Sequence, residues 1–107
     1  MTLIKASDRD AYLEKFKAVQ LRYNRNSKHY NTNYPVYNFG ESKGLTFDTV
    51  LIYPTNDMIT WIQDHSQPLE LTTQARFYVA LTRAKYSVGI FWKKANCNAT
   101  DISFWHN

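Results

Sequence analysis

Hydrophobic residues recur along the chain at helical and strand spacings, and these patterns predict how the elements follow one another. A helix over residues 8–23 is predicted by a stripe at intervals of four, three and four residues: Tyr12, Phe16, Val19 and Tyr23. A short strand over residues 2–6 is expected before this helix, and the stretch 23–37, rich in Asn and Tyr, is typical of a polar loop. The aromatic stripe is better explained as core than as a platform for stacking bases.

The second half of the chain alternates between strand and helix patterns. Residues 49–53 are β-branched and apolar without interruption, as in a central strand of a parallel sheet that is buried on both faces. Other expected elements are strands over residues 35–39 and 85–92, a short helix over 57–64, and a longer helix that Thr72 or Thr73 caps and that runs to Ala84. This order predicts an α/β layered fold with a mostly parallel sheet, in one domain over residues 1–107.

Composition supports a globular protein and excludes several classes. The chain has 107 residues, of which 44% are hydrophobic and 16% aromatic, enough apolar material for a core. A disulfide scaffold is excluded because Cys97 has no intramolecular partner. No apolar run approaches the roughly 20 residues that cross a bilayer, so we expect a cytoplasmic protein without membrane contact.

The charge is divided into three blocks along the sequence. The net charge of +4 is made up of +4 over residues 1–30, −4 over residues 31–70 and +4 over residues 71–107. A basic–acidic–basic pattern suits a surface that binds a polyanion, although a charge of this size is also common on a surface without a specific partner.

The chain lacks the motifs of a complete active site. It has only three glycines and no Walker A loop, which needs glycine backbone to surround a phosphate. It also has no nucleophile elbow, and its three histidines and one cysteine are too scattered to suggest a metal site. We therefore expect no metal centre in this chain.

Two segments carry the candidate chemistry. In the first, residues 38–52, a polar turn with Ser42, Lys43 and Gly44 joins two strands, and such turns at the ends of parallel strands bind phosphates in many α/β proteins. The alternative is an ordinary connection in which Gly44 only provides an unusual φ.

The second segment, residues 74–85, carries two arginines. On a continuous helix Arg76 and Arg83 share a face about 10 Å apart along the axis, with small apolar residues between them. On such a face a guanidinium group can lie flat and point towards a partner. The alternative is an amphipathic helix whose arginines pair with the acidic middle block.

Together, the sequences SKGLTFD at residues 42–48 and FYVALTRA at residues 77–84 resemble motifs V and VI of the UvrD/Rep-type superfamily 1 DNA helicases. They occur in that family's order, and the resemblance is strongest over residues 36–92. It implies a RecA-like (P-loop NTPase-like) domain, the second of two such domains, which has no Walker A loop of its own. ATP and Mg²⁺ then bind between this chain and the N-terminal RecA-like ATPase domain of the same helicase, and this chain alone binds neither tightly.

The resemblance also implies roles for individual residues in the nucleotide site. Arg83 matches the motif VI arginine finger, which reaches the γ-phosphate and is the expected catalytic residue. Gly44 and Thr46 fall on motif V positions near the nucleotide. Thr46 stands where many family members have a glutamate that contacts the ribose, so a hydroxyl that can make one hydrogen bond replaces a charged acceptor.

Single-stranded DNA is the other ligand that the resemblance implies. Ser42 and Lys43 fall on motif V positions that contact DNA in the family, whereas Gly40 replaces a histidine that many members place near DNA. Arg76 stands at a usually apolar position, where it either contacts phosphate or DNA, or faces solvent.

The expected function is the C-terminal part of an ATP-dependent DNA helicase, inactive without its ATPase domain. The alternative is a stand-alone nucleic-acid-binding or regulatory module that keeps the helicase fold without ATPase activity. A chance motif match is the third explanation. It predicts a structure without a parallel sheet, or with Arg83 buried away from any cleft.

Overall fold

The computed structural model describes residues 1–24, 26, 29–93 and 102–106. They form one six-stranded sheet in which every pair of neighbouring strands is parallel, with the strand order β3-β2-β4-β5-β1-β6. The strands are β1 (Thr2–Lys5), β2 (Val19–Arg22), β3 (Val36–Asn38), β4 (Phe47–Tyr53), β5 (Ala84–Trp92) and β6 (Ser103–Phe104). The α/β class and the parallel sheet are thus as predicted, and the arrangement is compatible with a RecA-like layered fold.

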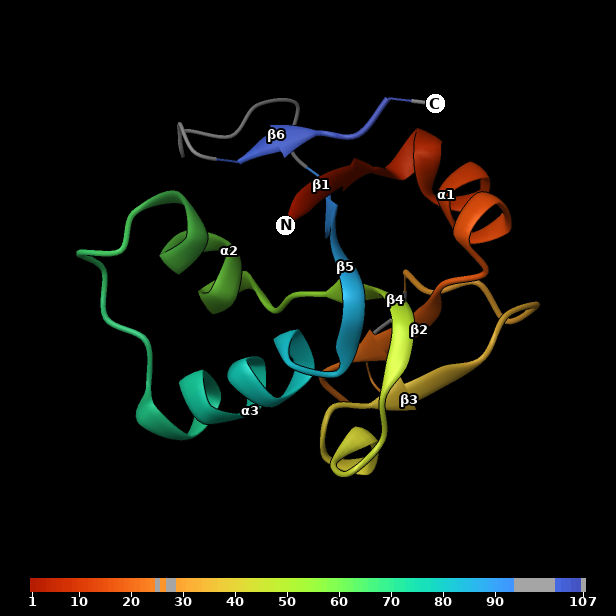
Figure 1. Cartoon of the computed structure of the whole chain (residues 1–107). Helices are drawn as coiled ribbons and strands as arrows, with labels where there is room; N and C mark the ends of the chain where they lie inside the picture. The colour runs from red at the N-terminus through yellow and green to blue at the C-terminus, as the bar shows by residue number, and fades with distance from the viewer. Residues whose placement is uncertain (25, 27–28, 94–101, 107) are drawn as a thin grey trace.

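Helices cover both faces of this sheet (Figure 1). One face packs against α2 (Asn56–Gln63) and α3 (Leu71–Leu81), and the other packs against α1 (Arg9–Phe16). Two short 3₁₀ turns, Ala6–Asp8 and Gly40–Ser42, connect the elements. Layers of this kind bury a parallel sheet on both faces.

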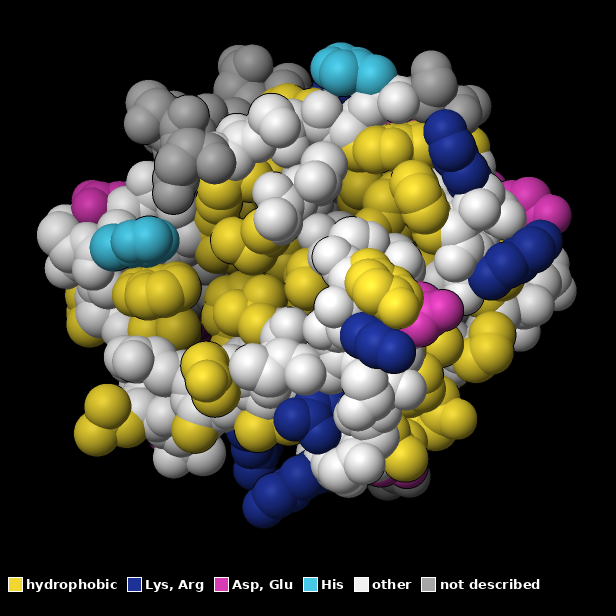
Figure 2. Space-filling view, in the orientation of Figure 1, with side chains coloured by type: hydrophobic (Ala, Val, Ile, Leu, Met, Phe, Trp, Pro, Cys, Tyr) yellow, Lys and Arg dark blue, Asp and Glu magenta, His cyan; other side chains and the backbone are white. Residues whose placement is uncertain are grey.

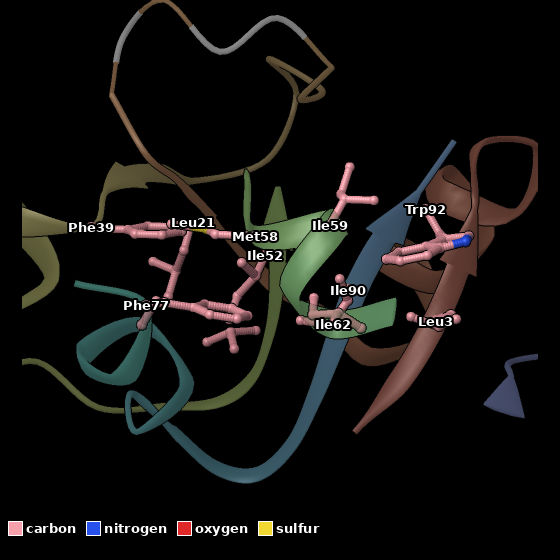
Figure 3. Close-up of a cluster of buried hydrophobic side chains, with 12 residues drawn as sticks. Leu3, Leu21, Phe39, Ile52, Met58, Ile59, Ile62, Phe77, Ile90 and Trp92 are labelled. Atoms are coloured by element: carbon pink, nitrogen blue, oxygen red, sulfur yellow. The ribbon is translucent and has the colours of Figure 1, made fainter. Parts of the chain in front are cut away.

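The strand β4 forms the centre of the fold, as its apolar sequence predicts. It lies between β2 and β5, and its side chains alternate between the two hydrophobic clusters. Val50 and Ile52 pack on the face covered by α2 and α3, and Leu51 and Tyr53 on the face covered by α1. The larger cluster brings Phe39, Met58, Phe77 and other side chains together between the sheet and the two helices (Figure 3).

The prediction of one helix over residues 8–23 is wrong. Helix α1 ends at Phe16 because Lys17 adopts a left-handed conformation with φ of 50°, and Val19–Arg22 then forms β2. The strand pairs with both β3 and β4, so hydrogen bonding within the sheet outweighs the helical spacing of the apolar residues.

The predicted boundaries of the longer helix are also wrong. Helix α3 begins at Leu71 and its N-cap is Glu70, so neither Thr72 nor Thr73 caps it. It ends at Leu81 rather than Ala84, because Ala84 already pairs with Phe47 at the start of β5. This early end changes the position of Arg83, as described below.

Close packing of α1 against the sheet depends on Gly89 of β5. A Cβ at this position would lie 2.9 Å from two atoms of the Tyr12 side chain. The Tyr12 ring therefore occupies the space that a larger residue would need, which explains a glycine inside a buried strand.

Candidate functional site at the junction of the 39–46 turn and helix α3

The segment between β3 and β4, here called the 39–46 turn, is held by hydrogen bonds within the turn and by one to the end of β2. The Phe39 N–H donates to the carbonyl of Arg22 at 2.7 Å, and the Leu45 N–H donates to the carbonyl of Ser42 at 2.9 Å. Both the N–H and the hydroxyl of Ser42 donate to the carbonyl of Phe39, at 3.2 and 2.7 Å. The Ser42 side chain is fully buried, so in this conformation it closes the turn and is not offered to a ligand.

The rest of the turn is open to solvent. Gly44 has a φ of +86°, a left-handed conformation that residues with a Cβ rarely adopt, and no neighbour lies within 4 Å of an added Cβ. Lys43, Gly44 and Thr46 are all exposed. The unusual φ of Gly44 is therefore real, and the backbone around it is accessible.

Arg83 lies just beyond α3, so the prediction that it shares a continuous helical face with Arg76 is wrong. Its guanidinium folds back to donate from Nε to the carbonyl of Val79 at 3.1 Å, and from Nη2 to the Thr82 hydroxyl at 3.3 Å. A third N–H, on Nη1, donates to the carbonyl of Leu45 in the 39–46 turn at 3.2 Å. Arg83 thus connects the C-terminal end of α3 to the turn.

The backbone joins the same two segments. The Phe47 N–H donates to the carbonyl of Arg83 at 2.8 Å, next to the Phe47–Ala84 pair of strands β4 and β5. The structure therefore brings together the two segments that the sequence singles out, although Leu45 and Arg83 are 38 residues apart. This juxtaposition follows from the pairing of two parallel strands.

Among the residues that the structure describes, the basic side chains of this region have no acidic partner. Within the described ranges the ion pairs are Arg9–Asp10 and Lys17–Glu14, and neither involves Lys43, Arg76 or Arg83. The predicted alternative in which the two arginines pair with the acidic middle block is therefore not what the structure shows. Lys and Arg side chains gather at the lower edge of the molecule, below α3 (Figure 2). This edge is suited to an anion.

Arg76 is exposed, but a neighbour holds its guanidinium in place. Its Nη1 donates to the Tyr23 hydroxyl at 3.1 Å, and the guanidinium carbon lies 5.5 Å from the centre of the Tyr23 ring. Arg76 and Lys43 both line a pocket of about 220 Å³ between α3 and the 39–46 turn, whereas Ser42 and Arg83 do not. The predicted DNA-binding residues thus separate into an accessible pair and one buried serine.

Sequence reasoning missed Tyr23, which it assigned to the core-facing stripe of a helix. Tyr23 instead follows β2 directly, and its half-buried ring packs edge-on against Phe39 with the ring centres 5.9 Å apart. The only signal in the sequence was its position at the start of the Asn- and Tyr-rich stretch.

The described part of the chain offers neither a metal site nor a membrane-spanning helix. It contains no group of three or more His, Cys, Asp or Glu side chains that could hold a metal ion. None of its helices is both long enough and apolar enough to cross a membrane. Comparison with protein-family models and with curated proteins found no match to this chain.

Proposed function

We propose that this chain is the second RecA-like domain of a UvrD/Rep-type superfamily 1 DNA helicase and that it supplies the arginine finger. The observation that carries the proposal is the position of Arg83, where the motif V and motif VI segments meet. Its guanidinium has no carboxylate partner among the described residues, so its charge is free to act on an anion.

The chemistry of Arg83 suits phosphoryl transfer. Three of its five N–H donors bind oxygen atoms of the protein within the described region, which fixes the plane of the guanidinium and leaves two donors for a ligand. A guanidinium held in this way can donate to phosphate oxygens as negative charge develops on them. The exposed backbone at Gly44 and the hydroxyl of Thr46 lie on the same turn and are proposed to contact the nucleotide.

In this proposal the rest of the ATP site belongs to another domain. The N-terminal RecA-like ATPase domain supplies the phosphate loop and the Mg²⁺ ligands, and single-stranded DNA runs over Lys43 and Arg76. Closure of the two domains around ATP brings Arg83 to the γ-phosphate, and reopening moves the pair along the strand. The proposed location is cytoplasmic.

The test is ATP turnover by a protein that contains both domains. Arg83→Ala should lower turnover by about 100-fold or more with a modest loss of ATP affinity, because an arginine finger contributes about 10³–10⁵ in rate. Arg83→Lys should restore little, since lysine lacks the planar fork. Lys85→Ala is the matched control, as it removes an exposed cation two residues away. Unchanged turnover in Arg83→Ala would remove Arg83 from the catalytic role.

A stand-alone nucleic-acid-binding or regulatory module is the second candidate, and it is favoured by the exposed cations Lys43 and Arg76, which form no ion pair over the described ranges. Both candidates predict that this chain binds single-stranded DNA weakly, with an affinity that falls as salt rises. The two candidates differ in what they require of the coding sequence upstream of residue 1: the helicase requires that it encode a Walker A and a Walker B motif. A titration at low salt that detects no binding contradicts both.

A further inference from the structure

The pocket between α3 and the 39–46 turn has one wall from each segment. Its lining consists of Phe39, Gly40, Lys43, Thr72, Ala75, Arg76 and Val79, and its volume is about 220 Å³. Ligand pockets for drug-sized molecules usually measure roughly 300–1,000 Å³. The space therefore suits one ring system of a larger ligand.

The walls of this pocket are small and mostly apolar. Ala75 and Val79 lie on the helix side, and Gly40 contributes only backbone to the turn side, beside Phe39 and Lys43. A Cβ built on Gly40 would have no heavy atom within 4 Å, so the backbone there faces open space. A flat ring can approach such walls closely, because no side chain projects from Gly40.

Two cations stand at the edge of these walls. Lys43 and Arg76 are exposed, and neither takes part in an ion pair over the described ranges. Tyr23 holds the Arg76 guanidinium through a hydrogen bond and its ring face, so this cation is already oriented before a ligand arrives. An anionic group bound here would meet two positive charges that no carboxylate neutralises within the described ranges.

We infer that the pocket binds one nucleotide, with the base against Ala75 and Val79 and the phosphate between Lys43 and Arg76. The combination of an apolar slot for a ring and a pair of cations for an anion matches a nucleotide better than an acidic peptide, which lacks a flat ring at each charge. The inference rests on the proposed DNA binding and identifies a single nucleotide as the part of the strand that the pocket holds. Free nucleotides and nucleotides within a strand share this chemistry.

Substitutions that fill the pocket without changing its charge test the inference. Isotope-labelled chain is titrated with thymidine monophosphate and with a short oligothymidylate, and affinities are read from backbone amide shifts. Ala75→Leu on the helix side and Gly40→Leu on the turn side should each weaken binding by about tenfold, as expected when the ring is excluded from its apolar contact surface. Ala6→Leu is the matched control, because Ala6 is also exposed and lies outside the pocket.

The two probes identify the source of the nucleotide. If the pocket variants bind both probes more weakly, the pocket accepts a free nucleotide. If they bind only the oligothymidylate more weakly, the pocket holds a nucleotide within a strand. Unchanged affinity for both probes in both pocket variants, with their fold intact by circular dichroism, overturns the inference. Equal competition by an oligoglutamate peptide also overturns it.

A charge series separates the pocket from general attraction to DNA. Arg76→Gln should weaken binding of the oligothymidylate several-fold more than Lys85→Gln, which removes the same charge outside the pocket. Equal losses in these two variants would contradict the pocket. This result is independent of the Arg83 turnover test, so failure of the pocket and failure of the arginine finger are distinguishable.

Discussion

Gln20 and Arg83 are both polar side chains that hold separate segments of the chain together, but their surroundings are opposite. Gln20 is fully buried on the α1 face of the sheet, where its amide nitrogen donates to the carbonyls of Asn31 and Tyr34. Its amide oxygen accepts from the Asn31 N–H and the Tyr53 hydroxyl. Arg83 is only half-buried and keeps its charge without a carboxylate partner in the described region.

The contrast separates the structural role of Gln20 from the functional role that we propose for Arg83. Every hydrogen-bonding group of the Gln20 side chain is satisfied within the protein, which fixes the loop before β3 against the sheet and leaves nothing for a ligand. Burial also raises the pKa of the Tyr53 hydroxyl, so this group stays a neutral donor. Arg83 uses part of its guanidinium to orient the rest, as expected of a group that binds a transient anion.

The largest stability effect should come from the buried amide. Gln20→Leu keeps most of the volume but leaves Asn31 and Tyr53 with unpaired buried groups, so it should lower the free energy of unfolding by about 3 kcal/mol. Urea unfolding followed by circular dichroism measures this, with Gln67→Leu as the control because that glutamine is exposed. A loss no larger than in the control would show that the network does not stabilise the fold.

Arg83 should show the reverse balance between stability and function. Arg83→Ala removes hydrogen bonds to the carbonyls of Val79 and Leu45 near the surface, so unfolding should become easier by only about 1 kcal/mol. The same substitution is expected to reduce ATP turnover far more in the two-domain protein. If the stability loss matches that of Gln20→Leu, Arg83 is mainly a structural link and the comparison fails.

The sequence predicts the fold best where local and tertiary preferences agree. The apolar run at residues 49–53 is both β-branched and long enough only for a buried strand, and it forms the centre of the sheet. The helix prediction is wrong after Phe16 because a lysine, Lys17, and not a glycine occupies the left-handed position that ends α1. No pattern within residues 17–23 indicates that residues 19–22 pair with strands 36–38 and 47–53.

The candidate site was predictable in its parts but not in its geometry. The motif resemblance singles out Arg83 and Lys43, and parallel strand pairing brings their segments together. The buried Ser42 hydroxyl donates within the 39–46 turn to the carbonyl of Phe39, and Arg76 contacts Tyr23, which is 53 residues away in the sequence. Neither periodicity nor composition predicts the hydrogen bond of one turn side chain or a contact between residues far apart in sequence.

The smallest expected effect is a pH dependence on the face that contains Gln20. The His29 ring stacks on Phe91, with the ring centres 5.4 Å apart, and the backbone carbonyl of His29 accepts a hydrogen bond from Arg9. Burial, and then the charges of Lys93 and Arg9, hold the pKa of His29 below its ordinary value of 6.5. The folded protein therefore binds this proton less readily than the unfolded chain does.

The sign of the pH effect follows from this difference in proton binding. Stability from the neutral His29 is fully present above about pH 6.5 and is lost as the pH falls from that value through the lower pKa of the folded protein, because the unfolded chain takes up the proton first. Since His29 is exposed, the loss is small. Melting temperatures measured between about pH 7 and about pH 5 should fall slightly more for the parent chain than for His29→Gln, which shares all other titrating groups. Parallel curves would show that proton binding at His29 is not coupled to folding, and that its stacking on Phe91 leaves the imidazole as well solvated as in the unfolded chain.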